Sequence, residues 1–481
     1  MTFNSFSFYL VFPIIFGIYW LIPAKWNQCR KLFLVIVSYL LYMNWKPSFA
    51  LVLVGVTLVT YLGGRSLSLE LNDEHGKSIE SDKIGVKRKR LVWLFAILGL
   101  LPLLMFKYYN FINDSISAGL AYIGLQFSLP GLNWAIPVGI SFFTFQAVGY
   151  LLDVYHGRVN AEKSIIDYVL FVSFFPQVFS GPISKADELM PQINKPKVFD
   201  YHQGVQGLKY LLWGMFLKLV LADRLGLYVD KVVSDYGMYG GGTCILSAFF
   251  YSLQIYGDFA GYSLMAIGVA MTLGFDLINN FKRPYLASSI TGFWKRWHIS
   301  LTRWLTQQVY IPLGGSRCSK PRNYWNIFVT FLVSGVWHGA NWTFIIWGAI
   351  HGVAQIVEKA LGISKTESKG IVKIVRIIGT FILVTLAWVF FRMPTLSDAL
   401  LFIGRMFSNF SLPEILSVTN FAIYVMAIVF VLFKEIREEF ISTSMKFLEN
   451  KYVKWAEYVI IFCIIMLCGA LDSGAFIYGS F

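Results

Sequence analysis

Charged residues are scarce in this chain of 481 residues. Only 14% are Asp, Glu, Lys or Arg, whereas 56% are hydrophobic, and an ordinary soluble domain carries roughly 25% charged residues. A sequence with so little charge cannot cover its folded surface with polar groups in water. The composition therefore excludes a soluble globular protein and indicates a polytopic membrane protein whose surface contacts membrane lipids.

Cysteine is also scarce, and the motifs of several enzyme classes are missing. The five cysteines are scattered and form no Cys-x-x-Cys pair: Cys29, Cys244, Cys318, Cys463 and Cys468. This spacing indicates neither a disulfide framework nor a zinc site. The sequence has no Gly-rich nucleotide loop, no Gly-x-Ser-x-Gly elbow and no paired carboxylate site. We therefore expect no bound metal and no bound cofactor.

Positive charge, in contrast, is in excess, with a formal net charge of +14. The cations concentrate at the ends of apolar runs, in segments 25–31, 87–90 and 295–303. This distribution is typical of cytoplasmic loops and of contacts with anionic lipid headgroups. We therefore expect membrane lipids, and no nucleic acid, among the partners.

The apolar residues gather into runs that are long enough, or nearly so, to cross the roughly 30 Å hydrocarbon core of a bilayer. These runs are 6–23, 31–45, 48–63, 91–112, 165–179, 206–222, 244–275, 323–360, 371–391, 417–433 and 454–471. They predict an all-α polytopic membrane protein with about eleven transmembrane helices plus re-entrant or interfacial helices. No clear repeat or linker divides the chain, so a single membrane-embedded domain over 1–481 is the simplest interpretation.

Segment 281–322 does not have the pattern of a plain membrane span. It mixes Lys and Arg with Trp and Tyr, and from Ile290 to Val309 cations and tryptophans interleave at roughly helical spacing. This pattern predicts an amphipathic helix lying at the cytoplasmic face. Pro312 and Gly314-Gly315 should end that helix.

The apolar run 323–360 is too long for one crossing. Its 38 residues would form a helix about 57 Å long at about 1.5 Å per residue. We expect a break near Gly335 or at Gly339-Ala340-Asn341, which places His338 at the interruption. Broken helices at membrane depth are tolerated where they are buried in protein or line a cavity, so we expect His338 to face a cavity.

Three of the six histidines lie in this part of the chain. His338 is a candidate general base, because a neutral imidazole can take a proton from a hydroxyl; a hydrogen-bonded core histidine is the equally weighted alternative. His298 lies in a cationic segment, where Lys295 and Arg296 should depress its protonation, and we expect a structural or substrate-positioning role. His351 is expected to pack. It is too far along the helix from His338 to share one reacting atom or a metal, unless the break folds the two together.

The remaining charged candidates have two interpretations. Lys295, Arg296 and Arg303 are either solvated and headgroup-facing charges, the more frequent outcome, or they hold a phosphorylated acyl donor at a cytoplasmic mouth. Asp258 is the best candidate for a structural or tunnel role among the acids in apolar surroundings, which are Asp153, Asp223, Asp258 and Asp472.

Several ordered motifs resemble those of the membrane-bound O-acyltransferase family, in its bacterial branch of alginate O-acetylation proteins. They are 137–146 (Pro-Val-Gly-Ile-Ser-Phe-Phe-Thr-Phe-Gln), 153–155, 174–177, 181–183, 254–262, 280–285, 293–342, 388–392 and 476–478. The chain departs from the family pattern at Thr306-Gln307-Gln308, where Arg-Asp-Tyr is usual, and at Leu264, where many relatives have an aspartate.

The resemblance implies transfer of an acyl group, usually acetyl, toward an extracytoplasmic hydroxyl. It implies a ring of helices around a central tunnel, with His338, in Val-Trp-His-Gly-Ala, as the family's invariant histidine near a constriction. His298, in Arg-Trp-His-Ile-Ser, corresponds to a second family histidine, and both are catalytic candidates. The candidates for substrate or donor binding are Lys295, Arg296, Trp297, Arg303, Asp258, Trp337 and Asn341.

The function expected from this resemblance is O-acetylation of an extracytoplasmic polysaccharide. The expected donor is cytoplasmic acetyl-coenzyme A, and the expected location is the inner or cytoplasmic membrane. The expected partner is a separate extracytoplasmic acetyltransferase or esterase-like protein. One alternative is transfer of D-alanine or another acyl group to teichoic acid or peptidoglycan. The alternative from another class is a non-catalytic transporter or channel, which would predict inverted repeats or charged midplane pairs; neither is evident in the sequence.

Overall fold

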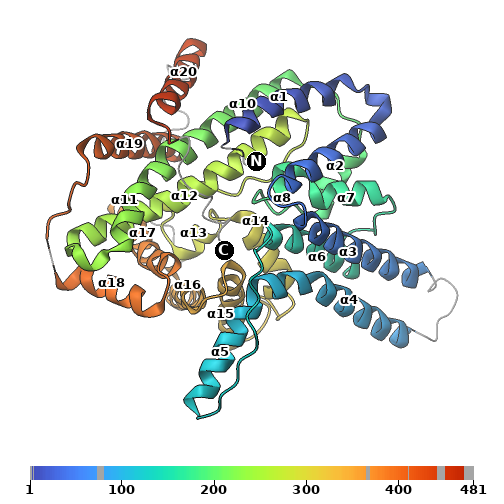
Figure 1. The fold of residues 1–481 in the computed structure, drawn as a ribbon, viewed down its shortest axis with the longest axis horizontal. Coiled ribbons are helices and arrows are strands. Elements are labelled where there is room, and N and C mark those ends of the chain that lie inside the picture. The colour runs from blue at the N-terminus through green and yellow to red at the C-terminus, as the bar shows by residue number, and fades with distance from the viewer. Residues whose placement is uncertain are drawn as a thin grey trace. The chain divides into compact units, whose positions relative to one another are not determined.

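The computed structural model describes residues 3, 5–72, 81–363, 369–409, 411–440 and 450–470, and the regular structure in these segments is helical, with no strand (Figure 1). The all-α fold class expected from the sequence is confirmed. Contacts between Cα atoms group the chain into two compact units. One unit is 1–207 with 269–278, and the other is 208–268 with 279–481. The expectation of a single domain stays a prediction.

The first unit contains the helices of the N-terminal part of the chain. They are α1 (Phe6–Leu21), α2 (Asn27–Met43), α3 (Phe49–Asn72), α4 (Ser81–Leu103), a π-helical turn (Leu104–Tyr108), α5 (Tyr109–Tyr122), α6 (Ile140–Tyr155), α7 (Ile165–Ser173), α8 (Phe175–Val178) and α9 (Ala186–Asn194). Helices α3, α4 and α6 pack on one another, and α2 packs on α7. A buried ion pair between Lys31 and Asp167, 2.8 Å apart, joins α2 to α7.

The second unit contains most of α10, all of α11, most of α12 and all helices after α12. These are α10 (Tyr201–Met215), a π-helical stretch (Phe216–Ala222), α11 (Asp223–Ser234), α12 (Gly241–Thr272), α13 (Ile290–Trp294), α14 (Ile299–Leu305), a π-helical turn (Thr306–Tyr310), α15 (Lys320–His338), α16 (Trp342–Ala360), α17 (Gly370–Arg392), α18 (Leu396–Ser408), α19 (Val418–Phe440) and α20 (Lys451–Cys468). The sequence motifs at 476–478 and the acid Asp472 lie outside the described residues.

Several helices have the length and composition of membrane spans. Within the described segments, five qualify: 49–68, 85–122, 201–234, 370–392 and 418–440. The pair 7–21 and 24–43, bent by 103°, adds a sixth if it is counted as one span. The expected number of about eleven crossings stays a prediction.

The break expected within 323–360 is confirmed. Helix α15 ends at His338 and α16 begins at Trp342. Asn341 caps α16, because its side-chain oxygen accepts a hydrogen bond from the Thr343 backbone N–H at 3.0 Å. Asn is one of the residues favoured at this position because its side chain satisfies a helix-end N–H group that has no intrahelical partner.

The prediction of one amphipathic helix over 290–309 is wrong. Helix α13 ends at Trp294, and His298 adopts a left-handed backbone conformation with φ 43°. Asn280 replaces the missing helical hydrogen bonds: its backbone oxygen accepts from the Ile299 N–H, and its side-chain oxygen accepts from the Ser300 N–H, both at 3.0 Å. The helical turn after α14 does end before Pro312, as expected.

Candidate active site

His338 lies at the C-terminal end of α15, where α15 and α16 form a tightly packed hairpin. The close approach depends on Gly335 and Gly348. A Cβ atom added at Gly335 would lie 2.3 Å from the carbonyl oxygen of Phe344, and one at Gly348 would lie 2.4 Å from that of Phe331. Only glycine allows the two backbones to approach so closely. The hairpin therefore brings α16 side chains directly against His338.

Aromatic rings enclose the His338 imidazole. Its ring centroid lies 4.9 Å from those of Trp337 and Trp347 and 5.2 Å from that of Phe391 on α17, each in an edge-to-face arrangement. The residue is only 2% exposed. These three rings restrict the orientation of the imidazole.

His298 is buried, although its neighbours in the sequence are cations. It is 0% exposed and packs edge-to-face on Phe259 at 4.6 Å and on Trp337 at 5.6 Å. Burial lowers the pKa of its imidazole to about 3. The cause is therefore desolvation, and not the neighbouring cations that we had expected to depress its protonation. Trp337 contacts both catalytic candidates, since its ring also lies against His338.

His351 is brought near His338 by the helix break. The indole of Trp347 lies 4.9 Å from the imidazoles of both His338 and His351. The indole N–H of Trp294 donates to Nδ1 of His351 at 3.4 Å, which places the proton of a neutral imidazole on Nε2. This buried environment is consistent with the expected packing role.

The described residues offer no group of three or more His, Cys, Asp or Glu side chains that could hold a metal ion. The indole of Trp347 lies against the imidazoles of both His338 and His351.

The three cations predicted to be either headgroup-facing or part of a donor mouth lie in different surroundings. Lys295 is exposed, and Arg303 on α14 is half-buried. Arg296 forms an ion pair with Glu439 at the end of α19, 2.9 Å apart, and the same carboxylate binds Arg283 at 2.8 Å. The charge of Arg296 is thus already engaged within the protein. Glu439 and Arg283 were not predicted from the sequence, because their contacts join segments about 150 residues apart.

Asp258 has a structural partner. Its carboxylate accepts a hydrogen bond from the Lys218 ammonium at 2.6 Å, and the same ammonium donates to Asp223 at 2.7 Å. All three side chains are buried. The ammonium of this buried lysine uses two of its three N–H donors on the two carboxylates, and the three side chains join α12 to the π-helical stretch and α11. Of the structural and tunnel roles expected for Asp258, this geometry supports the structural one.

Trp297 and Asn341 also have structural partners. Trp297 is fully buried and stacks on Phe293 at 5.4 Å. Asn341 caps α16 and also donates to the carbonyl oxygen of Pro394 at 2.8 Å. A further residue that the sequence analysis missed is Glu358, whose two carboxylate oxygens accept from the Ile290 and Thr291 N–H groups at the start of α13. In the sequence, Glu358 is marked only by being a single acidic residue in an apolar run.

The fold and this site define an all-α integral membrane protein with an enclosed histidine at a helix break. Comparison with known families identifies the class further. The model of the membrane-bound O-acyltransferase family matches residues 161–393, a range that includes His298, His338 and α17.

Similar proteins cover most of the chain. The probable alginate O-acetylase AlgI of Pseudomonas syringae pv. tomato is 38% identical over 413 residues, which are 85% of this chain and 75% of the relative. The peptidoglycan O-acetyltransferase of Helicobacter pylori is 33% identical over 431 residues, 83% of this chain and 78% of the relative. The teichoic acid D-alanyltransferase of Streptococcus thermophilus is 28% identical over 287 residues, 56% and 65% of the two chains.

The chain therefore belongs to the membrane-bound O-acyltransferase family. It is an O-acyltransferase and an integral membrane protein. A transporter or channel, the alternative from another class, is not supported by any of these likenesses.

Proposed function

We propose that this acyltransferase uses acetyl-coenzyme A on the cytoplasmic side of the inner or cytoplasmic membrane. The acetyl group moves across the membrane for O-acetylation of an extracytoplasmic polysaccharide. Support comes from the relatives that align over most of this chain, which are named as alginate O-acetylases and a peptidoglycan O-acetyltransferase.

His338 acts as the general base in this proposal. The oxygen of the acceptor hydroxyl bonds to the carbonyl carbon of the thioester while its proton moves to the imidazole. The carbon–sulfur bond then breaks, the acetyl group remains on the acceptor oxygen as an ester, and the coenzyme A thiolate takes the proton from the imidazolium. One histidine thus serves as base and then as acid, and no metal or bound cofactor takes part.

The observation that carries this assignment is the position of His338 at a helix break among three aromatic rings. A titratable side chain placed so deeply in apolar surroundings is costly unless it is used or hydrogen-bonded. The rings also restrict the orientation of the imidazole and exclude water from it, which favours transfer to the acceptor over hydrolysis.

His298 has a supporting role in the proposed mechanism. Its contact with Trp337, which in turn contacts His338, allows it to hold that indole in place. With a pKa of about 3 it stays neutral near pH 7. We therefore assign the proton transfers to His338 and a positioning role to His298.

Donor binding is assigned to the cationic segment before α15. Lys295 is exposed, so its ammonium can contact the phosphates of coenzyme A. Arg303 on α14 is the second candidate for this contact. Arg296 forms an ion pair with Glu439, and this pair positions the cationic segment. On the extracytoplasmic side, a separate acetyltransferase or esterase-like protein completes transfer to the polysaccharide.

The decisive experiment replaces His338 with Ala or Gln and measures acetyl esters on the surface polysaccharide of cells that express the variant. His202→Ala is the matched control, because His202 is an exposed histidine on α10. We expect loss of at least 100-fold in acetyl transfer for His338 variants, the range typical of general base removal, and wild-type activity for the control.

Two results would contradict the proposal. Full acetylation by a His338 variant that is expressed and folded like the wild type would exclude the base assignment. Unchanged acetylation after deletion of the gene would exclude the polysaccharide substrate. Measurement of ester-linked D-alanine in the same cells tests the alternative acyl group, because a loss of D-alanine with unchanged acetate would identify a D-alanyl transferase.

A further inference from the structure

Residues 296–300, here called the His298 turn, pair with an earlier segment of the second unit that begins at Asn280. At one end of the pairing, Asn280 accepts hydrogen bonds from two backbone N–H groups of the turn, both at 3.0 Å. At the other end, the Lys282 N–H donates to the carbonyl oxygen of Arg296 at 2.9 Å. The His298 turn is therefore supported by contacts with this earlier segment.

Each of the two paired segments contains a residue in an unfavourable backbone conformation. In the described part of the chain, the non-glycine residues with positive φ are Arg283 at 48° and His298 at 43°. Side chains other than those of Asn and Asp rarely adopt this left-handed conformation. Strained backbone of this kind persists only where the surrounding structure holds it, and it is concentrated at functional sites. Both strained residues belong to this one pairing, so the groups around the pairing must hold it in place.

Glu439, in the last turn of α19, contacts both segments. One of its carboxylate oxygens accepts a hydrogen bond from Nε of Arg283 at 2.8 Å, and the other lies 2.9 Å from Nη2 of Arg296. Arg296 also donates from Nη1 to the carbonyl oxygen of Arg283 at 3.4 Å. Hydrogen bonds between charged groups are stronger than those between neutral groups. The Glu439 side chain is only 15% exposed, so these contacts are screened less than those of a surface ion pair.

The Glu439 carboxylate also offsets a repulsion between the two arginines. Arg283 and Arg296 both direct a guanidinium group at this one carboxylate, and two like charges so close together repel each other. The neighbouring acid Glu438 lies 3.3 Å from Arg283 and is more exposed, at 43% of its side chain. Loss of the Glu439 charge should therefore push apart the two segments and loosen the His298 turn.

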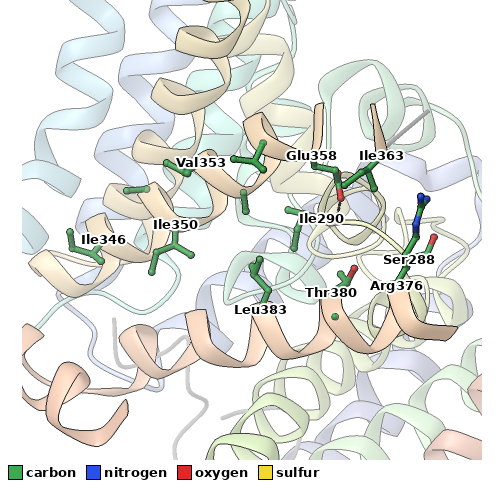
Figure 2. A pocket seen from close by; sticks show the side chains of 14 residues that line it. Ser288, Ile290, Ile346, Ile350, Val353, Glu358, Ile363, Arg376, Thr380 and Leu383 are labelled. Atoms are coloured by element: carbon green, nitrogen blue, oxygen red, sulfur yellow. Dashed lines mark hydrogen bonds between the residues drawn. The ribbon is translucent and has the colours of Figure 1, made fainter. Parts of the chain in front are cut away.

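A second carboxylate holds the stretch of chain between the two segments. Glu358 on α16 accepts hydrogen bonds from the Ile290 and Thr291 N–H groups at the start of α13, at 2.7 and 2.8 Å. Figure 2 shows Glu358 beside Ile290, on the wall of a groove between α16 and α17. The start of α13 is thus held from α16, whereas the His298 turn is held from α19 through Glu439.

The His298 turn contacts the candidate base through one indole. The ring centroid of His298 lies 5.6 Å from that of Trp337, and the ring of Trp337 lies 4.9 Å from the imidazole of His338. A displacement of the turn therefore moves a ring that lies directly against His338. Misplacement of a reacting group by about 1 Å can lower a reaction rate about 100-fold.

We propose that Glu439 is a positioning residue for acyl transfer. Through Arg283 and Arg296 it holds the His298 turn, and the turn keeps Trp337 in place against His338. Glu439 therefore acts on the rate of the reaction and not on the affinity for the donor. Helix α19 takes part in the reaction in this way, although it lies outside residues 161–393 that the family model matches. The inference rests on the proposed role of His338 as the base.

The first measurement compares Glu439→Gln with Glu457→Gln in the full chain in nanodiscs. Glutamine keeps the size of the side chain and removes its charge. Glu457 on α20 is the matched control, because it also pairs with an arginine of α19, Arg437 at 3.6 Å, and its side chain is 22% exposed. Hydrogen exchange followed by mass spectrometry reports on the Ile299 and Ser300 N–H groups. We expect at least fivefold faster exchange of these groups in Glu439→Gln and the wild-type rate in Glu457→Gln.

The second measurement is acetyl transfer from acetyl-coenzyme A to surface polysaccharide in membranes of cells that express each variant. For Glu439→Gln we expect kcat per folded molecule to fall at least tenfold, and KM for acetyl-coenzyme A to stay within twofold of the wild type. Glu457→Gln should keep both wild-type values. A merely structural role of Glu439 would lower the melting temperature and leave kcat per folded molecule unchanged.

Other results would overturn the proposal. Unchanged exchange in Glu439→Gln would show that the carboxylate does not hold the His298 turn. Faster exchange with unchanged kcat would show that the position of the turn does not affect the reaction. A rise in KM with unchanged kcat would assign Glu439 to donor binding. Absence of acetyl transfer by the wild type would contradict the proposed function instead, and the exchange rates would still decide whether Glu439 holds the turn.

Discussion

The imidazole of His338 lies edge-to-face against the indole of Trp347, with ring centroids 4.9 Å apart. The two residues belong to different helices, α15 and α16. The contact exists because the chain reverses direction over three residues after His338, and because Gly335 and Gly348 let the helices cross closely. The orientation of the candidate base is thus set by a side chain on the following helix.

Replacement of Trp347 by Ala should therefore lower activity more than it lowers the amount of folded protein. The change removes a fully buried indole, which costs about 3–5 kcal/mol of stability, and it takes away one of the three rings that restrict the orientation of His338. Trp347→Phe keeps a ring against the imidazole and should retain more activity. Acetyl transfer per folded molecule is the measurement. Equal specific activity of Trp347→Ala and the wild type would show that this indole does not position His338.

Gly335→Ala should destabilise the protein although it adds a single methyl group. The new Cβ would lie 2.3 Å from a backbone oxygen of Phe344, so the two helices must separate, at a cost of about 1–3 kcal/mol. Gly55→Ala on α3 is the control, because a Cβ there meets no atom within 4 Å. Thermal unfolding in detergent compares the two variants. A Gly335→Ala melting temperature no lower than that of the control would contradict the close crossing of α15 and α16.

Stability should fall as the pH decreases below about 6.5, in part because of His298. Its folded-state pKa is lowered to about 3 by burial, whereas an unfolded histidine titrates near 6.5. Between these values the unfolded chain binds a proton that the folded chain does not, so the stabilisation is fully present above pH 6.5 and is lost progressively toward pH 3.

The measurement for His298 is the melting temperature between pH 7.5 and pH 5, for the wild type and for His298→Gln. The variant cannot take up this proton when it unfolds, so its melting temperature should depend less on pH. His202→Ala, which removes an exposed histidine, should keep the wild-type dependence. Identical pH dependence of the wild type and His298→Gln would exclude the burial of a neutral imidazole at this position.

Lys218→Ala should be among the most destabilising single changes in the chain. It would leave the buried carboxylates of Asp223 and Asp258 without their shared ammonium, and loss of one member of a buried charge group costs about 3–5 kcal/mol. The triple variant Lys218→Met, Asp223→Asn, Asp258→Asn removes all three charges and should recover much of that loss. Chemical denaturation in detergent measures both. A triple variant less stable than Lys218→Ala would contradict this account.

Asp258→Asn should leave donor binding unchanged, because the carboxylate forms a buried ion pair with Lys218. We expect a lower melting temperature and a KM for the proposed donor, acetyl-coenzyme A, within twofold of the wild type. Asp276→Asn provides the comparison, since Asp276 is an exposed acid whose side chain accepts from Gln203. A large rise in KM without a loss of stability would contradict this expectation and would indicate that Asp258 contributes to donor binding.

The amino-acid sequence by itself determined the helices and the position of the break. Apolar runs of suitable length specify membrane helices wherever the solvent is lipid, and most predicted runs coincide with helices such as α3, α17 and α19. The break after His338 was also predictable, because a helix of 38 residues is too long and Gly339-Ala340-Asn341 supplies a stop and a cap. These are local properties of the chain.

The surroundings of the candidate site were decided by tertiary structure. His298 has cations as neighbours in the sequence, yet its imidazole is fully buried, and hydrogen bonds from the Ile299 and Ser300 N–H groups to Asn280 hold the turn at which it lies. The Arg296–Glu439 and Lys218–Asp258 pairs likewise join distant segments. Hydropathy along a sequence reports how far each residue prefers lipid to water. It carries no information about which distant group satisfies a particular hydrogen bond or charge, and that choice is made only when the helices pack.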